Sequence, residues 1–343
     1  MRQTLKIEEI ESASDRSELL SFSRHPLEAP ELTLRETFYP MGFPAELRTN
    51  SMEILEQAGK LWSIYEQRHD TRPIRIDVHV IEDSDTNASG ECPPAPVFRM
   101  MQPLLINMAG TDNVSVSDLE QCRTQIILAR STLQHANFLA YFFLMPAPLC
   151  HISSSYATPV HAACVALEGR GMLLCGDSGA GKSSLSYACA RAGWTYVTDD
   201  ATYLLHGGKN RLVTGNCHHV RFRPTAAELF PEIDGHAITP RAAGKPSIEL
   251  PTASMPWITR AESARVDYLI FLNRRTDSPP GLAPYRRSVA RNYMRQVLYG
   301  PPAALTAHYS TLERLLTAEI FELRYRDLDW AVDRLAALAR EGR

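Results

Sequence analysis

The chain of 343 residues lacks the charge and the cysteine pattern that mark several classes of protein. Its formal net charge of −3 gives no bulk electrostatic attraction to nucleic acid or to an anionic membrane. Its seven cysteines are scattered, and no two form a Cys-x-x-Cys pair. This spacing argues against a disulfide scaffold or a zinc site and fits a reducing compartment. We therefore expect a cytoplasmic protein with no nucleic-acid partner.

Long apolar runs are also missing. The first residues include acidic side chains where a signal peptide needs an apolar run. The most apolar stretch, residues 138–145, is too short to span a bilayer, and Pro146 follows it directly. We interpret this stretch as the end of a buried helix and expect no membrane partner.

The length predicts two domains, and the sequence changes character near residue 150. Residues 1–150 predict a mixed α/β domain suited to recognition of a substrate or partner. The spacing of Ile54, Leu55, Leu61 and Ile64 indicates a helix. The elements expected in this domain are a helix over 51–65, a strand over 75–83, a polar loop over 83–96, further strands within 97–110 and 113–129, and a helix over 133–144.

Residues 151–343 predict an α/β domain whose first part reads strand, turn, strand, glycine-rich loop, helix and strand. Further along, two short β-prone segments predict a hairpin, and an apolar run predicts a buried strand. The closing helix carries apolar residues at helical spacing from Leu328 onward. The expected elements are a hairpin over 202–216, a strand over 266–273, a helix over 288–298 and the helix from residue 328.

The sequence GDSGAGKS (176–183) satisfies the phosphate-binding pattern G-x-x-x-x-G-K-[ST] in full. Its three glycines permit a backbone whose N–H groups point inward to an anion, and the following helix adds its dipole. Lys182 can reach the β- and γ-phosphates, and the Ser183 hydroxyl can ligate Mg²⁺. The alternative is a helix cap after a glycine turn. The residues expected to bind the nucleotide are Gly176, Asp177, Ser178, Gly179, Ala180, Gly181, Lys182, Ser183 and Ser184.

Asp199 and Asp200 follow Lys182 by 17 and 18 residues, at the end of a predicted strand. The strand of a phosphate loop and the next strand are commonly neighbours, so this strand end is expected near the phosphates. If the pair is extended, its side chains point to opposite faces, and one addresses the nucleophile while the other meets metal or a partner side chain. Alternatively, both lie in a turn. Such a carboxylate can accept a proton from a hydroxyl or hold Mg²⁺, or it can simply cap the strand.

Two further positions bear on this site. The later apolar strand ends at Asn273 and so lacks the carboxylate with which many nucleotide hydrolases hold a metal ion. This absence favours Asp199 and Asp200 as the working acids, and disfavours a switch GTPase or an ATPase motor. His161 lies 21 residues before Lys182, and a histidine beside an apolar strand is by itself more typical of a structural role.

Together, the upstream histidine, the loop GDSGAGKS and the strand ending in Asp-Asp resemble the C-terminal catalytic domain of HPr kinase/phosphorylase and its relatives. The resemblance covers residues 158–206 and continues more loosely to the chain end. It implies a P-loop fold related to phosphoenolpyruvate carboxykinase, with ATP and Mg²⁺ used to phosphorylate a serine hydroxyl. By position, Lys182 and Ser183 would hold phosphates and Mg²⁺, and Asp200 would be the catalytic base. Asp199 would be its partner near substrate or metal, and His161 would lie near the transferring phosphate.

The chain also departs from that family. The EIRG-type signature that accompanies the reverse, phosphate-dependent reaction is missing, so we expect a dedicated kinase. The first 150 residues resemble the front part of HPr-kinase-like enzymes that phosphorylate lasso-peptide precursors on a terminal serine. The expected partner is therefore a serine-bearing peptide or protein, and homo-oligomerisation is left open. Glu228 is a candidate second metal carboxylate, and Lys245 is a candidate phosphate contact.

Two basic segments allow either a binding role or a solvated surface. Arg287, Arg291 and Arg295 recur every four residues and share one helix face, which suits an acidic substrate or a phosphate. The same alternatives hold for His218, His219, Arg221 and Arg223, which alternate along a predicted strand. Two functions compete with a peptide serine kinase. They are a kinase for a small hydroxyl metabolite and a nucleotide-binding regulator without an acceptor.

Overall fold

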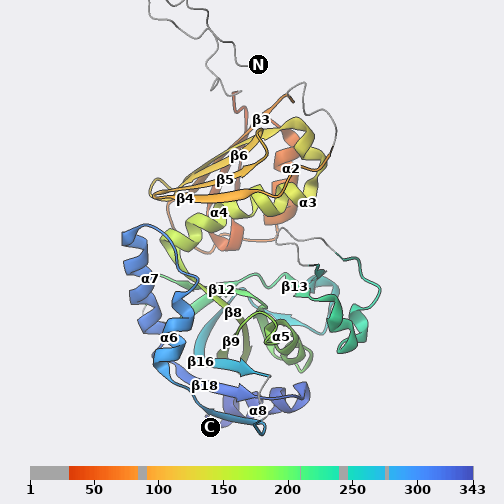
Figure 1. The fold of residues 1–343 in the computed structure, drawn as a ribbon, viewed down its shortest axis with the longest axis vertical. Coiled ribbons are helices and arrows are strands. Elements are labelled where there is room, and N and C mark those ends of the chain that lie inside the picture. Colours follow the sequence, from red (N-terminus) through yellow and green to blue (C-terminus); the bar gives the residue numbers. More distant parts are fainter. Residues whose placement is uncertain (1–30, 84–90, 209, 239–245, 275–277, 343) are drawn as a thin grey trace, which may run out of the picture.

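The computed structural model describes residues 31–83, 91–208, 210–238, 246–274 and 278–342. The fold is mixed α/β and has two units, each built around its own sheet (Figure 1). The smaller unit contains the N-terminal part of the described chain, and the larger unit contains the C-terminal part. The two units meet along an interface that borders the candidate site.

The N-terminal unit is a sheet of seven strands among the described residues, in the order β1-β2-β3-β7-β6-β5-β4. Strands β2, β3 and β7 run parallel, and the remaining neighbours pair antiparallel. Helix α2 forms within the predicted range and buries Ile54, Ala58 and Trp62. Of the other residues that predicted it, Leu55 and Leu61 are half-buried, and Ile64 lies past the helix end and is exposed. The bounds are β1 Leu34–Phe38, β2 Ala45–Thr49, α2 Met52–Trp62, β3 Ile74–Ile81, β4 Val97–Met101, β5 Leu104–Ala109, β6 Asn113–Asp118 and β7 Arg123–Ala129.

The predicted end of the apolar helix at Pro146 is wrong, because the helical chain continues to Tyr156. A wide turn, in which the Met145 N–H donates to the Ala140 carbonyl, precedes the proline. Pro146 then starts a new helical segment, where its missing N–H costs nothing. The segments are η2 Arg130–Gln134, α3 Ala136–Leu139, η3 Ala140–Leu144, α4 Pro146–His151 and η4 Ile152–Tyr156.

Within the described residues, the span Ala136–Tyr156 is long and apolar enough to cross a membrane by length and composition alone. However, 61% of its most apolar window is buried in the protein. Phe138, Phe143 and Ile152 from this span pack in the core of the N-terminal unit, against α2 and the sheet. A buried core helix explains its composition.

The second unit starts with β8 at Ala157, just after the boundary expected near residue 150. Its largest sheet has the order β15-β10-β8-β11-β12-β16-β18-β17, and β9 pairs with both β8 and β16. The predicted hairpin, apolar strand and closing helix correspond to β11 with β12, to β16 and to α8. The bounds are β8 Ala157–Leu167, β9 Arg170–Cys175, α5 Lys182–Arg191, β10 Thr195–Thr198, β11 Ala201–Leu205, β12 Leu212–Gly215, β13 His219–Phe222, η5 Pro224–Glu228, η6 Pro231–Ile233, β14 Ile248–Pro251, η7 Thr252–Ser254, β15 Thr259–Arg260, β16 Ser263–Asn273, β17 Gly281–Pro284, α6 Arg287–Arg295, α7 Pro302–Leu315, β18 Glu319–Arg324 and α8 Leu328–Glu341.

The long strand β8 organises this unit. Its first half pairs with β11, and its second half pairs with β9. Strand β10 also pairs with β8, so the expectation that β10 lies beside β9 is wrong. Alternate side chains of β8 enter different cores, with Val160 and Ala162 facing α6 and α7 and with Ala163 and Val165 facing α5 and α8.

Candidate functional site

The glycine loop connects β9 to α5, as the sequence pattern requires. Gly176, Gly179 and Gly181 all have positive φ, which side chains with a Cβ rarely adopt. A Cβ on Gly181 would also lie 2.9 Å from the Tyr325 hydroxyl oxygen. Glycine is therefore required at this position both for its backbone conformation and for the close approach of a neighbour.

Tyr293 on α6 fixes the start of the loop, a role that no motif in the sequence indicates. Its hydroxyl oxygen accepts from the Gly176 N–H at 3.0 Å. The same hydroxyl lies 2.7 Å from the Gly176 carbonyl oxygen and 3.2 Å from the His161 carbonyl oxygen. One side chain thus connects the loop, strand β8 and helix α6.

Lys182, His161 and Asp200 form a chain of polar contacts in front of the loop. Lys182 Nζ lies 3.1 Å from His161 Nε2, and His161 Nδ1 lies 3.3 Å from Asp200 Oδ1. The ammonium also donates to the carbonyl oxygens of Gly176 and Asp177. Because an ammonium has only donors, His161 Nε2 must accept, which places the imidazole proton on Nδ1, facing Asp200.

The pKa directions agree with this arrangement. Burial, assisted by the Lys182 charge, lowers the pKa of His161, so the imidazole is neutral near pH 7. Burial also lowers the pKa of Lys182, and the negative charge of Asp200 opposes that effect. A neutral His161 can therefore accept from Lys182 and donate to Asp200 at the same time.

The path of β8 explains why these residues meet. His161 stands opposite Ala201, directly after the aspartate pair, and Ala162 stands opposite Cys175, directly before the loop. His161 is thus the residue at which β8 passes from one neighbour to the other. It shares a strand face with Ala163, which packs in the same core as Leu185 of α5, so its side chain points toward the loop helix.

The aspartate pair lies in the bend between β10 and β11, so the turn alternative is the one observed. Asp199 is 5% exposed, and its two carboxylate oxygens accept from the Tyr196 hydroxyl at 3.3 Å and the Arg221 backbone N–H at 3.1 Å. Burial raises the pKa of Asp199 to about 6. The Asp200 side chain is 45% exposed. Asp200 is therefore the more accessible carboxylate of the pair.

A cavity of about 470 Å³ lies in front of the loop. Its wall includes Lys182, Ser183 and both aspartates, and also the basic residues Arg221, Arg223 and Arg274. Arg223 donates to the Ser178 hydroxyl oxygen at 3.4 Å. The alternating pattern in the sequence had already marked Arg221, on β13, and Arg223, directly after it, as candidates. No motif marked Arg274, which directly follows β16. Such an arginine-lined cavity has the charge that a polyphosphate requires.

One sequence-predicted candidate does not belong to the described wall of this cavity. Glu228 is exposed on η5 and is not part of the cavity wall, so the structure gives no support to a metal role for it. Lys245 lies outside the described residues. His218 lies edge-on to the ring of Tyr65 in the N-terminal unit, with the ring centres 4.9 Å apart. His219 is the first residue of β13.

Two of the three arginines on the basic face of α6 contact α7. Arg291 forms a two-bond ion pair with Glu313 of α7, with both N–O distances at 2.7 Å. Arg295 lies 3.8 Å from the same carboxylate and 4.8 Å from the centre of the Tyr309 ring. The two arginines hold α6 against α7, while Arg287 is exposed.

The oxygen donors at the loop are compatible with Mg²⁺. The described residues contain no group of three or more His, Cys, Asp or Glu side chains that could hold a metal ion. Mg²⁺ does not need such a cage, because it commonly takes one or two protein oxygens together with substrate phosphates and water. The Ser183 hydroxyl and the Asp199 carboxylate line one cavity and supply oxygens of this kind, and the Asp200 carboxylate lines it too.

Comparison of the sequence with known families and curated proteins finds no match. Among solved structures, the HPr(Ser) kinase/phosphatase from Coxiella burnetii is similar over 54% of this chain and 99% of its own, with 15% identity and a TM-score of 0.30. A similarity this weak does not support a functional assignment, which therefore depends on the geometry of the site.

Proposed function

We propose that the protein is an ATP-dependent kinase that transfers the γ-phosphoryl group to a serine hydroxyl of a peptide or protein. The observation that carries this proposal is the contact chain Lys182–His161–Asp200 at the glycine loop. It puts a phosphate-binding cation and an accessible carboxylate on two sides of one neutral imidazole. This is the pair of groups that phosphoryl transfer to a hydroxyl needs. A cytoplasmic location belongs to the same proposal.

In the proposed reaction the acceptor oxygen forms a bond to the γ-phosphorus as the bond to the β–γ bridging oxygen breaks, and ADP leaves. The loop N–H groups and Lys182 hold the phosphates, and Asp200 takes the proton from the acceptor hydroxyl. His161 orients the Asp200 carboxylate by donating from Nδ1. The Ser183 hydroxyl, with the Asp199 carboxylate in the same cavity wall, would hold Mg²⁺, and Asp200 is kept as the base. When bound, Mg²⁺ would neutralise phosphate charge.

Asp200→Asn tests the assignment of the base. The amide keeps the size of the side chain but cannot accept the proton, so we expect kcat to fall about a hundredfold or more. ATP affinity, measured by calorimetry, should stay within about twofold, because the loop and Lys182 are untouched. Asp234→Asn, at an exposed aspartate outside the cavity wall, is the matched control. An Asp200→Asn enzyme with unchanged turnover would rule out Asp200 as the base.

Labelled ATP separates the proposal from its competitors. The protein is incubated with the nucleotide and Mg²⁺, in parallel with serine-containing peptides, with peptides that end in serine and with free serine. Label on a peptide supports the proposal, and label on free serine alone supports a kinase for small metabolites. Tight nucleotide binding without label on any acceptor supports a regulator.

A further inference from the structure

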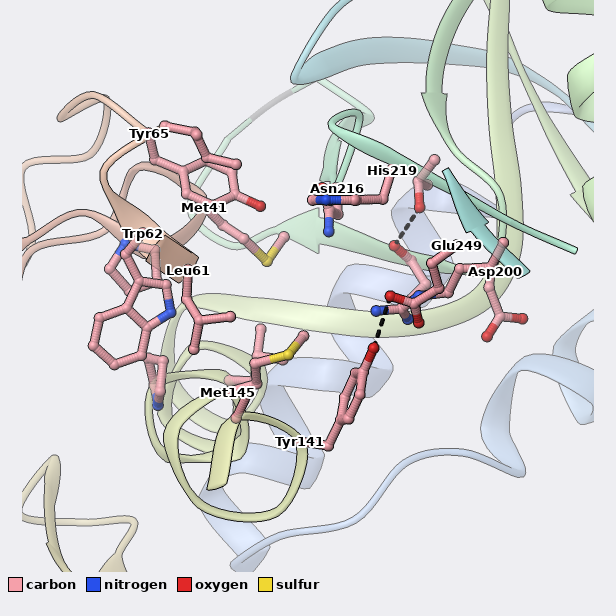
Figure 2. Close-up of a pocket in the computed structure, with 18 of the residues that line it drawn as sticks. Met41, Leu61, Trp62, Tyr65, Tyr141, Met145, Asp200, Asn216, His219 and Glu249 are labelled. Atoms are coloured by element: carbon pink, nitrogen blue, oxygen red, sulfur yellow. Dashed lines mark hydrogen bonds and ion pairs between the residues drawn. The ribbon is translucent and has the colours of Figure 1, made fainter. Parts of the chain in front are cut away.

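A second cavity, of about 260 Å³, lies between the two units beside the aspartate bend (Figure 2). The N-terminal unit contributes apolar side chains to one side of it, including Met41 from the turn before β2, Leu61 and Trp62 from α2, and Met145 before α4. The C-terminal unit contributes polar residues to the other side, among them Asn216 and His219. The cavity therefore has one apolar side and one polar side.

This cavity adjoins the phosphate cavity. Asp199, Asp200 and Arg221 are in the walls of both cavities. The carboxylate proposed as the base thus stands between the place for the phosphates and an apolar space. An acceptor hydroxyl must reach both Asp200 and the γ-phosphate, so an acceptor held in the second cavity would present it where the two cavities adjoin.

Two charged side chains in the wall form an ion pair with each other. Arg221 lies 2.9 Å from Glu249, and the Tyr141 hydroxyl donates to the other Glu249 oxygen at 2.7 Å across the unit interface. The other basic side chain of the wall, Lys60, is exposed on α2. A free amino acid needs partners for both its ammonium and its carboxylate. Within a peptide chain, those two groups are neutral amides, so the cavity suits a peptide better.

The volume of this second cavity limits the size of the group that it can hold. It is below the range of about 300–1,000 Å³ typical of pockets for drug-sized ligands, so it has room for one or two side chains.

We propose that this interdomain cavity is the acceptor site. It takes a large apolar side chain adjacent to the phosphorylated serine, and the serine hydroxyl thereby lies at Asp200. This inference rests on the proposed function, since it uses the same carboxylate. It adds that the N-terminal unit selects the acceptor, and that the selection is for an apolar neighbour of the serine.

Short end-blocked peptides with one serine test the inference. The residue on either side of the serine is Trp, Leu, Ala or Asp, and both phosphorylation and calorimetric binding are measured. We expect kcat/KM for the Trp or Leu peptides to exceed that of the Ala peptides by about tenfold to a hundredfold, and the Asp peptides to be poorer still. Equal rates for all of the peptides would overturn the acceptor site while the proposed kinase activity stands.

A second experiment uses variants whose larger side chains fill the cavity. Met145→Trp and Leu61→Trp should each remove the preference for an apolar neighbour and raise KM for the Leu peptides about tenfold. Met52→Trp, at an exposed position on the same helix as Leu61, is the matched control and should behave as the wild type. Retained preference in both filled variants, with their folding verified by circular dichroism, would also overturn the proposal.

Binding and transfer distinguish the two proposals. If the wild type binds the apolar peptides selectively, the filled variants lose this binding, and no label is transferred, then the cavity binds peptides and the proposed kinase is contradicted. Absence of both selective binding and transfer overturns the acceptor site. The affinity of each variant for ATP reports whether the phosphate cavity is intact.

Discussion

Replacing Asp199 by asparagine removes a buried charge while keeping the shape of the side chain. The carboxylate accepts from the Arg221 N–H and from the Tyr196 hydroxyl. In the variant, the amide oxygen can keep the bond from Arg221, and the amide nitrogen can donate to the Tyr196 oxygen. The substitution therefore preserves the local hydrogen bonding and removes only the cost of holding a buried negative charge.

The size of this cost is set by the pKa of Asp199, which burial raises to about 6 from an ordinary value of about 4. Two pKa units correspond to about 3 kcal/mol. Between pH 4 and pH 6 the folded protein binds the proton that the unfolded chain has lost, so stability falls as pH rises. Above pH 6 the full penalty is present, and below pH 4 it is absent.

We therefore expect Asp199→Asn to be more stable than the wild type by about 3 kcal/mol at pH 7.5, and about equally stable at pH 4. The measurement is urea unfolding, followed by tryptophan fluorescence and circular dichroism, without nucleotide and with a chelator. Asp200→Asn is the control, because this more exposed neighbour should change the free energy of unfolding by less than about 0.5 kcal/mol. A less stable Asp199→Asn at pH 7.5, or a difference that does not vary with pH, would show that the buried charge of Asp199 carries no such cost.

Three other side chains allow tests of the site and of the core. Lys182→Ala should weaken ATP binding about tenfold or more and reduce transfer with it, which calorimetry and a kinase assay measure; unchanged ATP affinity would contradict its role. Tyr293→Phe removes the hydroxyl that holds Gly176 and should weaken ATP binding about tenfold. Unchanged ATP affinity would show that the loop keeps its conformation without this contact. His151 is buried, and burial lowers its pKa to about 4, so the wild type should lose about 3 kcal/mol relative to His151→Gln as pH falls from 6.5 to 4; parallel unfolding curves at both pH values would contradict this.

The sequence predicted the local elements of the site well, because short-range patterns determine them. The loop lies between an apolar strand and a helix as the spacing of GDSGAGKS requires, and the hairpin, the strand ending at Asn273 and the closing helix all form. The mixed α/β class of both parts also agrees with the alternating and helical apolar spacing. The roles of Asp199, Asp200, His161 and Ser183 remain predictions, since geometry alone does not demonstrate them.

Long-range features were not predictable in the same way. The position of β10 beside β8 depends on how β8 divides its pairing between two neighbours, and no local pattern encodes this. Tyr293 reaches Gly176 from a helix more than a hundred residues later, as an ordinary aromatic residue of α6. The helix continues through Pro146 because a wide turn precedes it, which depends on packing in the core. The interdomain cavity depends on contacts between units, such as the one from Tyr141 to Glu249.

The number of residues at the start of strand β8, where the two units join, determines the direction of the His161 side chain. Ala157, at its start, is in the core of the N-terminal unit, and His161, farther along the same strand, contacts Lys182. A strand turns its side chains over with every residue, so inserting or deleting one residue between them would point His161 away from the loop. Changing the length by two would restore its direction. A crossover between the N-terminal unit and the C-terminal unit therefore keeps His161 directed toward the loop only when it preserves that parity.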